Sequence, residues 1–159
     1  MDLKQCGRTG LYLSAIGIGT LTWGRDTDGP EALDMLRRFV DAGGNLVECS
    51  ASHGDGMAVD ILSEAISAVG RHRVAVAWRG GVRRASEGAW VSAAGRGDLL
   101  RSLDDALARL DTDYVDVWSN RARRFLWRKR SRRQAQPTAL AARATSAYRG
   151  RRIGSLPRP

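Results

Sequence analysis

The sequence is poor in the residues from which metal sites, disulfide frameworks and membrane spans are built. It has two cysteines and two histidines in 159 residues, and Cys6 and Cys49 lie in no CxxC or other ligand spacing. We therefore expect no metal site, and isolated thiols favour a reducing, cytoplasmic location. No apolar run approaches the roughly 18 residues of a spanning helix, and the N-terminus carries no signal-peptide core. No membrane association is expected.

Acidic residues are absent from the last 41 positions. Residues 1–118 hold 13 Lys/Arg and 17 Asp/Glu, a net charge of −4, whereas residues 119–159 hold 12 Arg, one Lys and no acid, a net charge of +13. Helix and strand periodicity also stops at Trp118. We expect two parts, a folded domain over residues 1–118 and a disordered, Arg-rich tail over residues 119–159.

Short apolar runs alternate with amphipathic helical patterns before the tail. Such alternation indicates parallel strands joined by right-handed crossovers. The chain is long enough for one domain with a core, but a complete eight-fold barrel takes about 250 residues. We predict an α/β fold, a partial (β/α)8 TIM barrel with an N-terminal hairpin and about four parallel strand–helix units. The predicted hairpin covers 3–15, the strands 16–20, 46–47, 74–77 and 114–118, the helices 30–42, 58–69 and 98–110, and a polar connection 82–95.

The stretch from Asn45 to Gly56 carries the most reactive side chains. A short strand ends in Glu48, and His53 follows five residues later in a glycine-rich turn. In barrels of this kind, residues at the C-terminal ends of strands face the reaction site, where a carboxylate and an imidazole can transfer protons. Taken alone, Glu48 could equally be an ordinary strand-end carboxylate and His53 a surface histidine.

Three blocks of sequence, in the right order, resemble the aldo-keto reductase family. Ile18–Gly24 is similar to that family's first strand and turn, Phe39–Asn45 to the end of its first helix, and Leu110–Asp116 to its approach to the fourth strand. Glu-Cys-Ser-Ala-Ser-His-Gly, residues 48–54, also fits the spacing of the family motif Asp-Thr-Ala-x-x-Tyr-Gly. The likeness covers about residues 2–118.

The resemblance implies an NADPH-dependent carbonyl reductase with four altered site residues. In the family, a tyrosine is the general acid, a lysine paired with an aspartate lowers its pKa, and a histidine orients the carbonyl. Here Glu48 stands at the aspartate position, His53 at the tyrosine, Arg79 at the lysine and Arg121 at the histidine. Glu48 and Arg79 could still form an ion pair, and Arg79 would favour a neutral His53. We expect a truncated, catalytically inactive relative, with proton donation by His53 as the alternative.

The cofactor implied by the resemblance is NADP. Gly19, Thr20 and Leu21 match the turn that approaches the nicotinamide in the family, although Gly19 could also be an ordinary turn glycine. Most contacts to the nucleotide come from later strands of the barrel, which we expect this chain to lack. No GxGxxG or P-loop replaces them, so we expect cofactor binding to be impaired.

Three functions remain open on the sequence alone. The first is the inactive reductase-like chain, which would take a small carbonyl substrate only if active. The second is a module whose basic tail binds nucleic acid or another polyanion without sequence preference. The third is a subunit that self-associates to complete a barrel, since open sheet edges and an apolar sheet face would lack cover. A shift of reading frame near Trp118 would also produce an Arg-, Ala- and Pro-rich tail, and we favour it over evolved binding.

Overall fold

The computed structural model describes residues 1–120. The predicted disordered tail begins at residue 119, but Ser119 and Asn120 belong to strand β8, Val117–Asn120; the rest of the tail, with Arg121, lies outside the described residues, and the domain boundary at Trp118 stays a prediction. The elements are β1 Leu3–Gln5, β2 Tyr12–Ser14, β3 Gly17–Gly19, α1 Gly29–Asp41, β4 Leu46–Cys49, the 3-10 turn η1 His53–Gly56, α2 Met57–Val69, η2 Arg71–Arg73, β5 Ala75–Gly80, β6 Val82–Arg84, β7 Trp90–Ser92, α3 Arg96–Arg109 and β8 Val117–Asn120.

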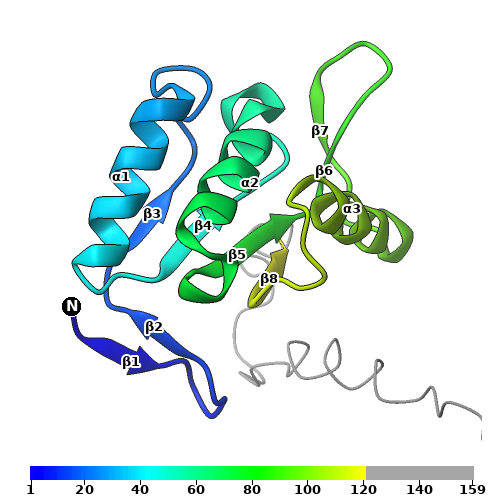
Figure 1. Cartoon of the computed structure of the whole chain (residues 1–159). Helices are drawn as coiled ribbons and strands as arrows, with labels where there is room; N and C mark the ends of the chain where they lie inside the picture. The colour runs from blue at the N-terminus through cyan, green and yellow to red at the C-terminus, as the bar shows by residue number, and fades with distance from the viewer. Residues whose placement is uncertain (121–159) are drawn as a thin grey trace, which may run out of the picture.

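Four parallel strands form the central sheet in the order β3-β4-β5-β8. The order follows the chain because each strand is joined to its neighbour by a crossover through the helix layer. The antiparallel hairpin β1–β2 lies at the N-terminal ends of these strands (Figure 1). The predicted α/β fold with an entry hairpin and four parallel strands is therefore confirmed.

The three helices lie side by side over one face of the sheet (Figure 1). α1 begins where the sequence indicates, because the Asp28 side chain accepts a hydrogen bond from the Glu31 N–H and Pro30 occupies the first turn. Buried side chains of α1 and α2 pack with alternate residues of β4 and β5, such as Val47 and Val76. Since side chains alternate along a strand, the intervening residues point to the opposite face of the sheet, which carries the candidate site.

The polar connection predicted at residues 82–95 is wrong, because it contains the hairpin β6–β7. Its strands pair antiparallel with Val82 opposite Ser92 and Arg84 opposite Trp90. Each strand has only three residues, too few for a two-residue periodicity to be recognised. The hairpin stands at the C-terminal end of β5, beside α3 (Figure 1).

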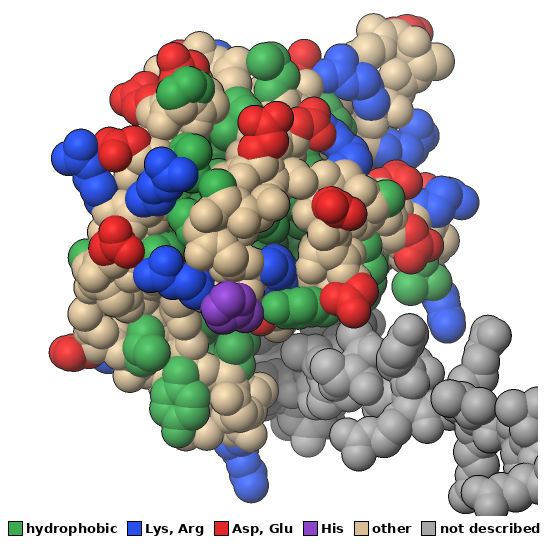
Figure 2. All heavy atoms as spheres, in the orientation of Figure 1, with side chains coloured by type: hydrophobic (Ala, Val, Ile, Leu, Met, Phe, Trp, Pro, Cys, Tyr) green, Lys and Arg blue, Asp and Glu red, His purple; other side chains and the backbone are tan. Residues whose placement is uncertain are grey.

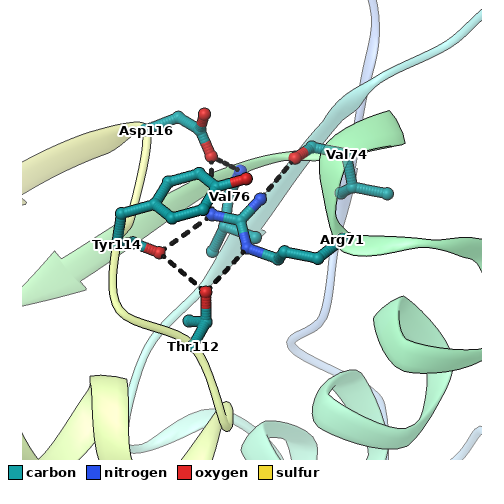
Figure 3. A network of polar contacts seen from close by, with 6 residues as sticks. All are labelled: Arg71, Val74, Val76, Thr112, Tyr114 and Asp116. Carbon is teal, nitrogen blue, oxygen red and sulfur yellow. Dashed lines mark hydrogen bonds and ion pairs between the residues drawn. The ribbon is translucent and has the colours of Figure 1, made fainter.

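The fourth strand lies three residues later than predicted, at Val117–Asn120. The preceding stretch is held instead by Arg71, whose guanidinium donates to the carbonyl of Tyr114 and to the carboxylate of Asp116, both at 2.9 Å (Figure 3). The guanidinium also lies over the Tyr114 ring at 3.9 Å from its centre. The Asp116 carboxylate accepts a further hydrogen bond from the Val76 N–H at 2.8 Å. These contacts anchor the loop before β8 to the start of β5.

The surface over the helices carries charges of both signs. Figure 2 shows Lys and Arg side chains interspersed with Asp and Glu, with several basic side chains near the base of the β6–β7 hairpin. Two large apolar residues, Ile16 and Leu21, are exposed beside the edge strand β3. Across residues 1–120, no helix combines the length and apolarity that crossing a membrane requires.

Candidate functional site

The C-terminal ends of β4 and β5 bring the predicted site residues together. Gly19, Glu48 and Ala77 stand in register across β3, β4 and β5. Arg79 follows Ala77 by two residues and therefore faces the same side of the sheet. His53 belongs to η1, which comes directly after β4 in the chain. Glu48 and Arg79, 31 positions apart, thus meet at one end of the sheet.

Arg79 is the centre of this cluster. Its Nε donates to Glu48 Oε1 at 2.8 Å, and its Nη2 lies 2.7 Å from the same oxygen. Nη2 also lies 3.1 Å from His53 Nε2. The ion pair predicted between Glu48 and Arg79 is therefore formed. Their side chains are 34% and 33% exposed, so solvent partly screens the attraction.

The contacts of His53 define where its proton lies. A guanidinium can only donate hydrogen bonds, so Nε2, facing Arg79, must be an unprotonated acceptor. The proton of the neutral ring is then on Nδ1, which lies 3.0 Å from Thr20 Oγ1 and donates to it. His53 is 3% exposed and Thr20 is fully buried. Both ring nitrogens are engaged, and no N–H of the imidazole points toward an open approach.

The backbone of the η1 turn places His53 in the interior. Three successive residues, Gly54, Asp55 and Gly56, have φ of 53°, 55° and 99°, in the left-handed region that favours glycine. A Cβ on Gly54 would lie only 1.8 Å from the Trp23 carbonyl oxygen. The Gly54 N–H also donates to the Leu21 carbonyl at 3.3 Å. The turn therefore packs directly on the segment after β3, which also supplies Thr20.

Asp55 joins this turn to the β6–β7 hairpin. Its Oδ1 accepts a hydrogen bond from Trp90 Nε1 at 2.7 Å and lies 2.8 Å from Arg84 Nη2. The Arg84 guanidinium stacks over the Trp90 ring at 4.8 Å. The Trp90 hydrogen bond, followed by the one from Arg84, lowers the pKa of the Asp55 carboxyl. Sequence reasoning missed this contact because the partners lie 29 and 35 positions away and give no local signal.

Cys49 and Ser50 support the site from within the protein. Cys49 is fully buried, and this burial raises the pKa of its thiol to about 11. The thiol is therefore protonated near neutral pH and cannot act as a nucleophile, which requires the thiolate. The Ser50 hydroxyl donates to the Arg79 carbonyl at 2.9 Å and so joins the backbones after β4 and within β5.

The turn expected to approach a nicotinamide, Gly19 to Leu21, has two exposed residues on either side of a buried one. Gly19 and Leu21 are exposed, Leu21 by 58%, and only Glu48 Oε2, at 3.9 Å, comes near the place of a Gly19 Cβ. Thr20 between them is buried and its hydroxyl contacts His53. Among the described residues, the one polar side chain of this turn, Thr20, is therefore already hydrogen-bonded within the protein.

Comparison with known proteins gives concordant matches. The sequence model of the Aldo/keto reductase family matches residues 15–121. A protein named as a voltage-gated potassium channel subunit beta, from Oryza sativa subsp. japonica, is 31% identical over 118 residues, covering 74% of this chain and 36% of that protein. The chain thus spans about a third of the length of this curated relative.

Solved structures of aldo-keto reductases superpose on the same region. One from Pseudomonas aeruginosa has a TM-score of 0.66 and 27% identity, covering 74% of this chain and 45% of its own. One from Klebsiella pneumoniae, in complex with NADPH, has a TM-score of 0.54 and 26% identity, covering 67% of this chain and 34% of its own. Both structures match in fold as well as in sequence.

Proposed function

Because this chain belongs to the aldo/keto reductase family, we propose that it is a member without carbonyl reductase activity, in which the reaction site has become a structural network. One observation carries this proposal. Arg79 is shared between the Glu48 carboxylate and His53 Nε2, with contacts of 2.7 to 3.1 Å. Residues at the positions that resemble the family's site therefore bind one another, and His53 Nε2 is occupied by Arg79.

The chemistry of these groups supports the proposal. Reduction of a carbonyl needs a proton donor within hydrogen-bond reach of the carbonyl oxygen. His53 Nε2 has no proton to give, and its Nδ1–H is used by Thr20. Arg79 does not serve as an acid, because a guanidinium stays charged in proteins and only donates hydrogen bonds. Neither residue can replace a tyrosine as general acid.

Use of NADP by this chain is part of the same proposal. The Klebsiella pneumoniae neighbour was solved with NADPH, so relatives of this fold take that cofactor. In this chain, the Thr20 hydroxyl is committed to His53, and we infer that any NADP binding is weak and leads to no hydride transfer. The reaction is therefore expected to fail at proton donation even where a cofactor is supplied.

The experiment that tests this proposal is an NADPH oxidation assay on the purified full chain with a panel of small aldehydes. Consumption of NADPH should not exceed the rate without protein, and a functional reductase in the same panel shows that the assay works. Turnover that is lost in both His53→Ala and Arg79→Met would overturn the proposal. Turnover that neither substitution changes would come from a contaminant.

A second candidate function rests on the charge of the tail. Residues 119–159 carry a net charge of +13 with no acidic residue, and Phe125, Trp127 and Tyr148 lie among the arginines. Clustered arginines attract phosphates and aromatic side chains stack on exposed bases, so we propose non-specific binding of polyanions. Duplexes of unrelated sequence should bind equally, and affinity should fall by orders of magnitude from low to moderate salt. Binding that withstands high salt contradicts the proposal.

A further inference from the structure

A cavity of about 370 Å³ lies between the β6–β7 hairpin and α3. Its size is at the lower end of the roughly 300–1,000 Å³ of small-molecule sites. Neither Glu48, His53 nor Arg79 lines it. Trp78, which does line it, is the neighbour of Arg79 on β5 and belongs to the core on the helix side of the sheet. The cavity is therefore separate from the candidate site described above.

The walls of the cavity suit a flat apolar group. Two of them are indole rings, one from Trp78, which is 2% exposed, and one from Trp90 on the hairpin. Val82 and Ala106 contribute small apolar surface between the hairpin and α3. Aromatic side chains bind planar rings by stacking or edge contacts in addition to apolar burial. A ring system would therefore be the apolar part of a ligand here.

Hydrogen-bond donors are in excess around these walls. Four arginines and two aspartates line the cavity, which leaves its lining with a net positive charge. Three of the arginines are paired: Arg84 with Asp55, Arg109 with Asp60 and Arg101 with Asp98. Of these three aspartates, only Asp98 lines the cavity. The Arg83 side chain makes no hydrogen bond or ion pair within residues 1–120, although the Arg83 backbone pairs with Val91 in the hairpin. The lining residues with a charge are Arg83, Arg84, Arg101, Arg109, Asp98 and Asp105.

Two further hydrogen-bond donors, the Ser102 hydroxyl and the Trp118 indole N–H, lie close together beside Gly80. The Ser102 hydroxyl accepts a hydrogen bond from Trp78 Nε1 at 3.4 Å, and in the described part of the chain its own proton has no acceptor. Trp118 Nε1 is buried and has no hydrogen-bond partner within the same residues. A Cβ on Gly80 would lie 3.0 Å from Trp118 Nε1 and 3.4 Å from Ser102 Oγ. Both side chains therefore pack closely on Gly80, and of the two only Ser102 lines the cavity.

We propose that this cavity binds a small planar aromatic anion, such as an aromatic carboxylate. The ring lies against Trp78 and Trp90, and the anionic group accepts hydrogen bonds from the unpaired donors of the lining, Arg83 and Ser102. Burying these donors against a neutral apolar ligand would leave them unsatisfied, which is costly. Charge and ring are therefore both required for binding.

The test is isothermal titration of the full chain with naphthalene-1-carboxylate. Naphthalene-1-methanol, with the ring but no charge, and acetate, with the charge but no ring, are the comparison ligands. The carboxylate should bind about tenfold or more tightly than either of them, because each lacks one of the two contacts. No binding of the carboxylate up to millimolar concentration, or equal binding of the alcohol, would overturn the proposal.

Three variants locate the binding. Arg83→Gln removes an exposed, unpaired donor of the lining, and Ala108→Phe fills the cavity from the exposed side of α3. Each should weaken binding of the carboxylate about tenfold. Arg96→Gln is the control, because Arg96 is exposed on the same helix but does not line the cavity, and it should change affinity less than about twofold. Equal effects of Arg83→Gln and Arg96→Gln, or none of Ala108→Phe, would contradict the site.

Discussion

Arg79 is the residue on which the candidate site depends, because its guanidinium is shared by two acceptors on different elements. A lysine would be a single point charge, whereas the planar fork of arginine offers several donors at fixed angles. Arg79 uses Nε and Nη2 toward Glu48 and Nη2 toward His53. Because a guanidinium can only donate, the same arrangement requires His53 Nε2 to be the unprotonated nitrogen of the ring.

Arg79→Met should lower the free energy of unfolding by about 1–3 kcal/mol, because partly buried acceptors on Glu48 and His53 lose their donor. Equilibrium unfolding in urea measures the loss. Arg38→Met is the matched control, since Arg38 pairs with Asp34 one turn away on α1 with both side chains largely exposed. Such pairs contribute only about 0.3–0.5 kcal/mol. Equal losses in the two variants would show that the Arg79 network is not stabilising.

The two cysteines should react very differently. Cys6 is exposed and Cys49 is buried, with the pKa of its thiol raised to about 11 from an ordinary 9.0. Iodoacetamide near pH 8 should label Cys6 alone in the native protein and both residues in denaturant, as read by mass spectrometry. Since the unfolded thiol ionises first, the stability contributed by the protonated Cys49 is present below pH 9 and is lost as pH rises toward 11. Rapid native labelling of Cys49 would contradict its burial.

At the scale of elements, the η1 turn is held from two sides. In the segment after β3, the Trp23 carbonyl packs directly against Gly54. On the other side, Arg84 and Trp90 of the β6–β7 hairpin donate hydrogen bonds to Asp55. Neither contact involves a neighbour in sequence. The position of His53 therefore depends on the packing of the turn between these two elements.

Gly54→Ala should destabilise the fold by about 3 kcal/mol or more, because a Cβ there would overlap the Trp23 carbonyl and the backbone is left-handed. Gly88→Ala is the control. Gly88 also has a positive φ, of 85°, but nothing lies within 4 Å of its Cβ position, so only the backbone cost of about 1 kcal/mol applies. Thermal or urea unfolding of both variants measures the difference. Equal costs would mean that the turn relaxes away from Trp23.

The contacts of the Asp55 carboxylate with Trp90 and Arg84 should be lost in acid. The pKa of Asp55 in the folded protein is lowered from 3.8. The stability that these carboxylate contacts contribute is therefore present above pH 3.8, the pKa in the unfolded chain, and is lost as pH falls through the lower pKa of the folded state. The NMR resonance of the Trp90 indole N–H should shift over that range, and hydrogen exchange of the hairpin amides should accelerate. Asp55→Asn removes the titrating group while tolerating the left-handed backbone. A pH-dependent shift that persists in Asp55→Asn would contradict this assignment.

At the scale of the whole molecule, charge is divided sharply along the chain. Residues 1–118 are slightly acidic, whereas residues 119–159 carry thirteen basic residues and no acid. The face of the described residues in Figure 2 mixes both signs, and residues 1–118 together carry a net charge of only −4. Attraction of polyanions therefore belongs to the tail under the proposal made above.

Replacing half of the tail arginines by glutamine should flatten the salt dependence of duplex DNA binding. The slope of log affinity against log salt should lose about 0.9 for each phosphate contact removed. Fluorescence anisotropy at several salt concentrations measures this slope. Replacing the same arginines by lysine keeps the charge and should keep the slope. An unchanged slope in the glutamine variant would show that binding, where present, uses the described domain.

Local patterns in the sequence determined the broad architecture. Alternating strand and helix signals predicted the parallel sheet, and Asp28 with Pro30 marked the start of α1, because capping and periodicity depend on residues a few positions apart. The Glu48–Arg79 ion pair was also predictable, since both residues lie at the C-terminal ends of neighbouring strands.

Tertiary contacts alone decided the rest. The β6–β7 hairpin is too short to be recognised by periodicity and is fastened through Arg84 to Asp55, 29 positions away. β8 starts at Val117, after the predicted position, because Arg71 binds the carboxylate of Asp116, 45 positions away. The protonation of His53 depends on Arg79 and Thr20, 26 and 33 positions away. Hydrogen bonds between residues so distant form only once the chain has folded, and the sequence predicts them only where, as for Glu48 and Arg79, both residues end neighbouring strands.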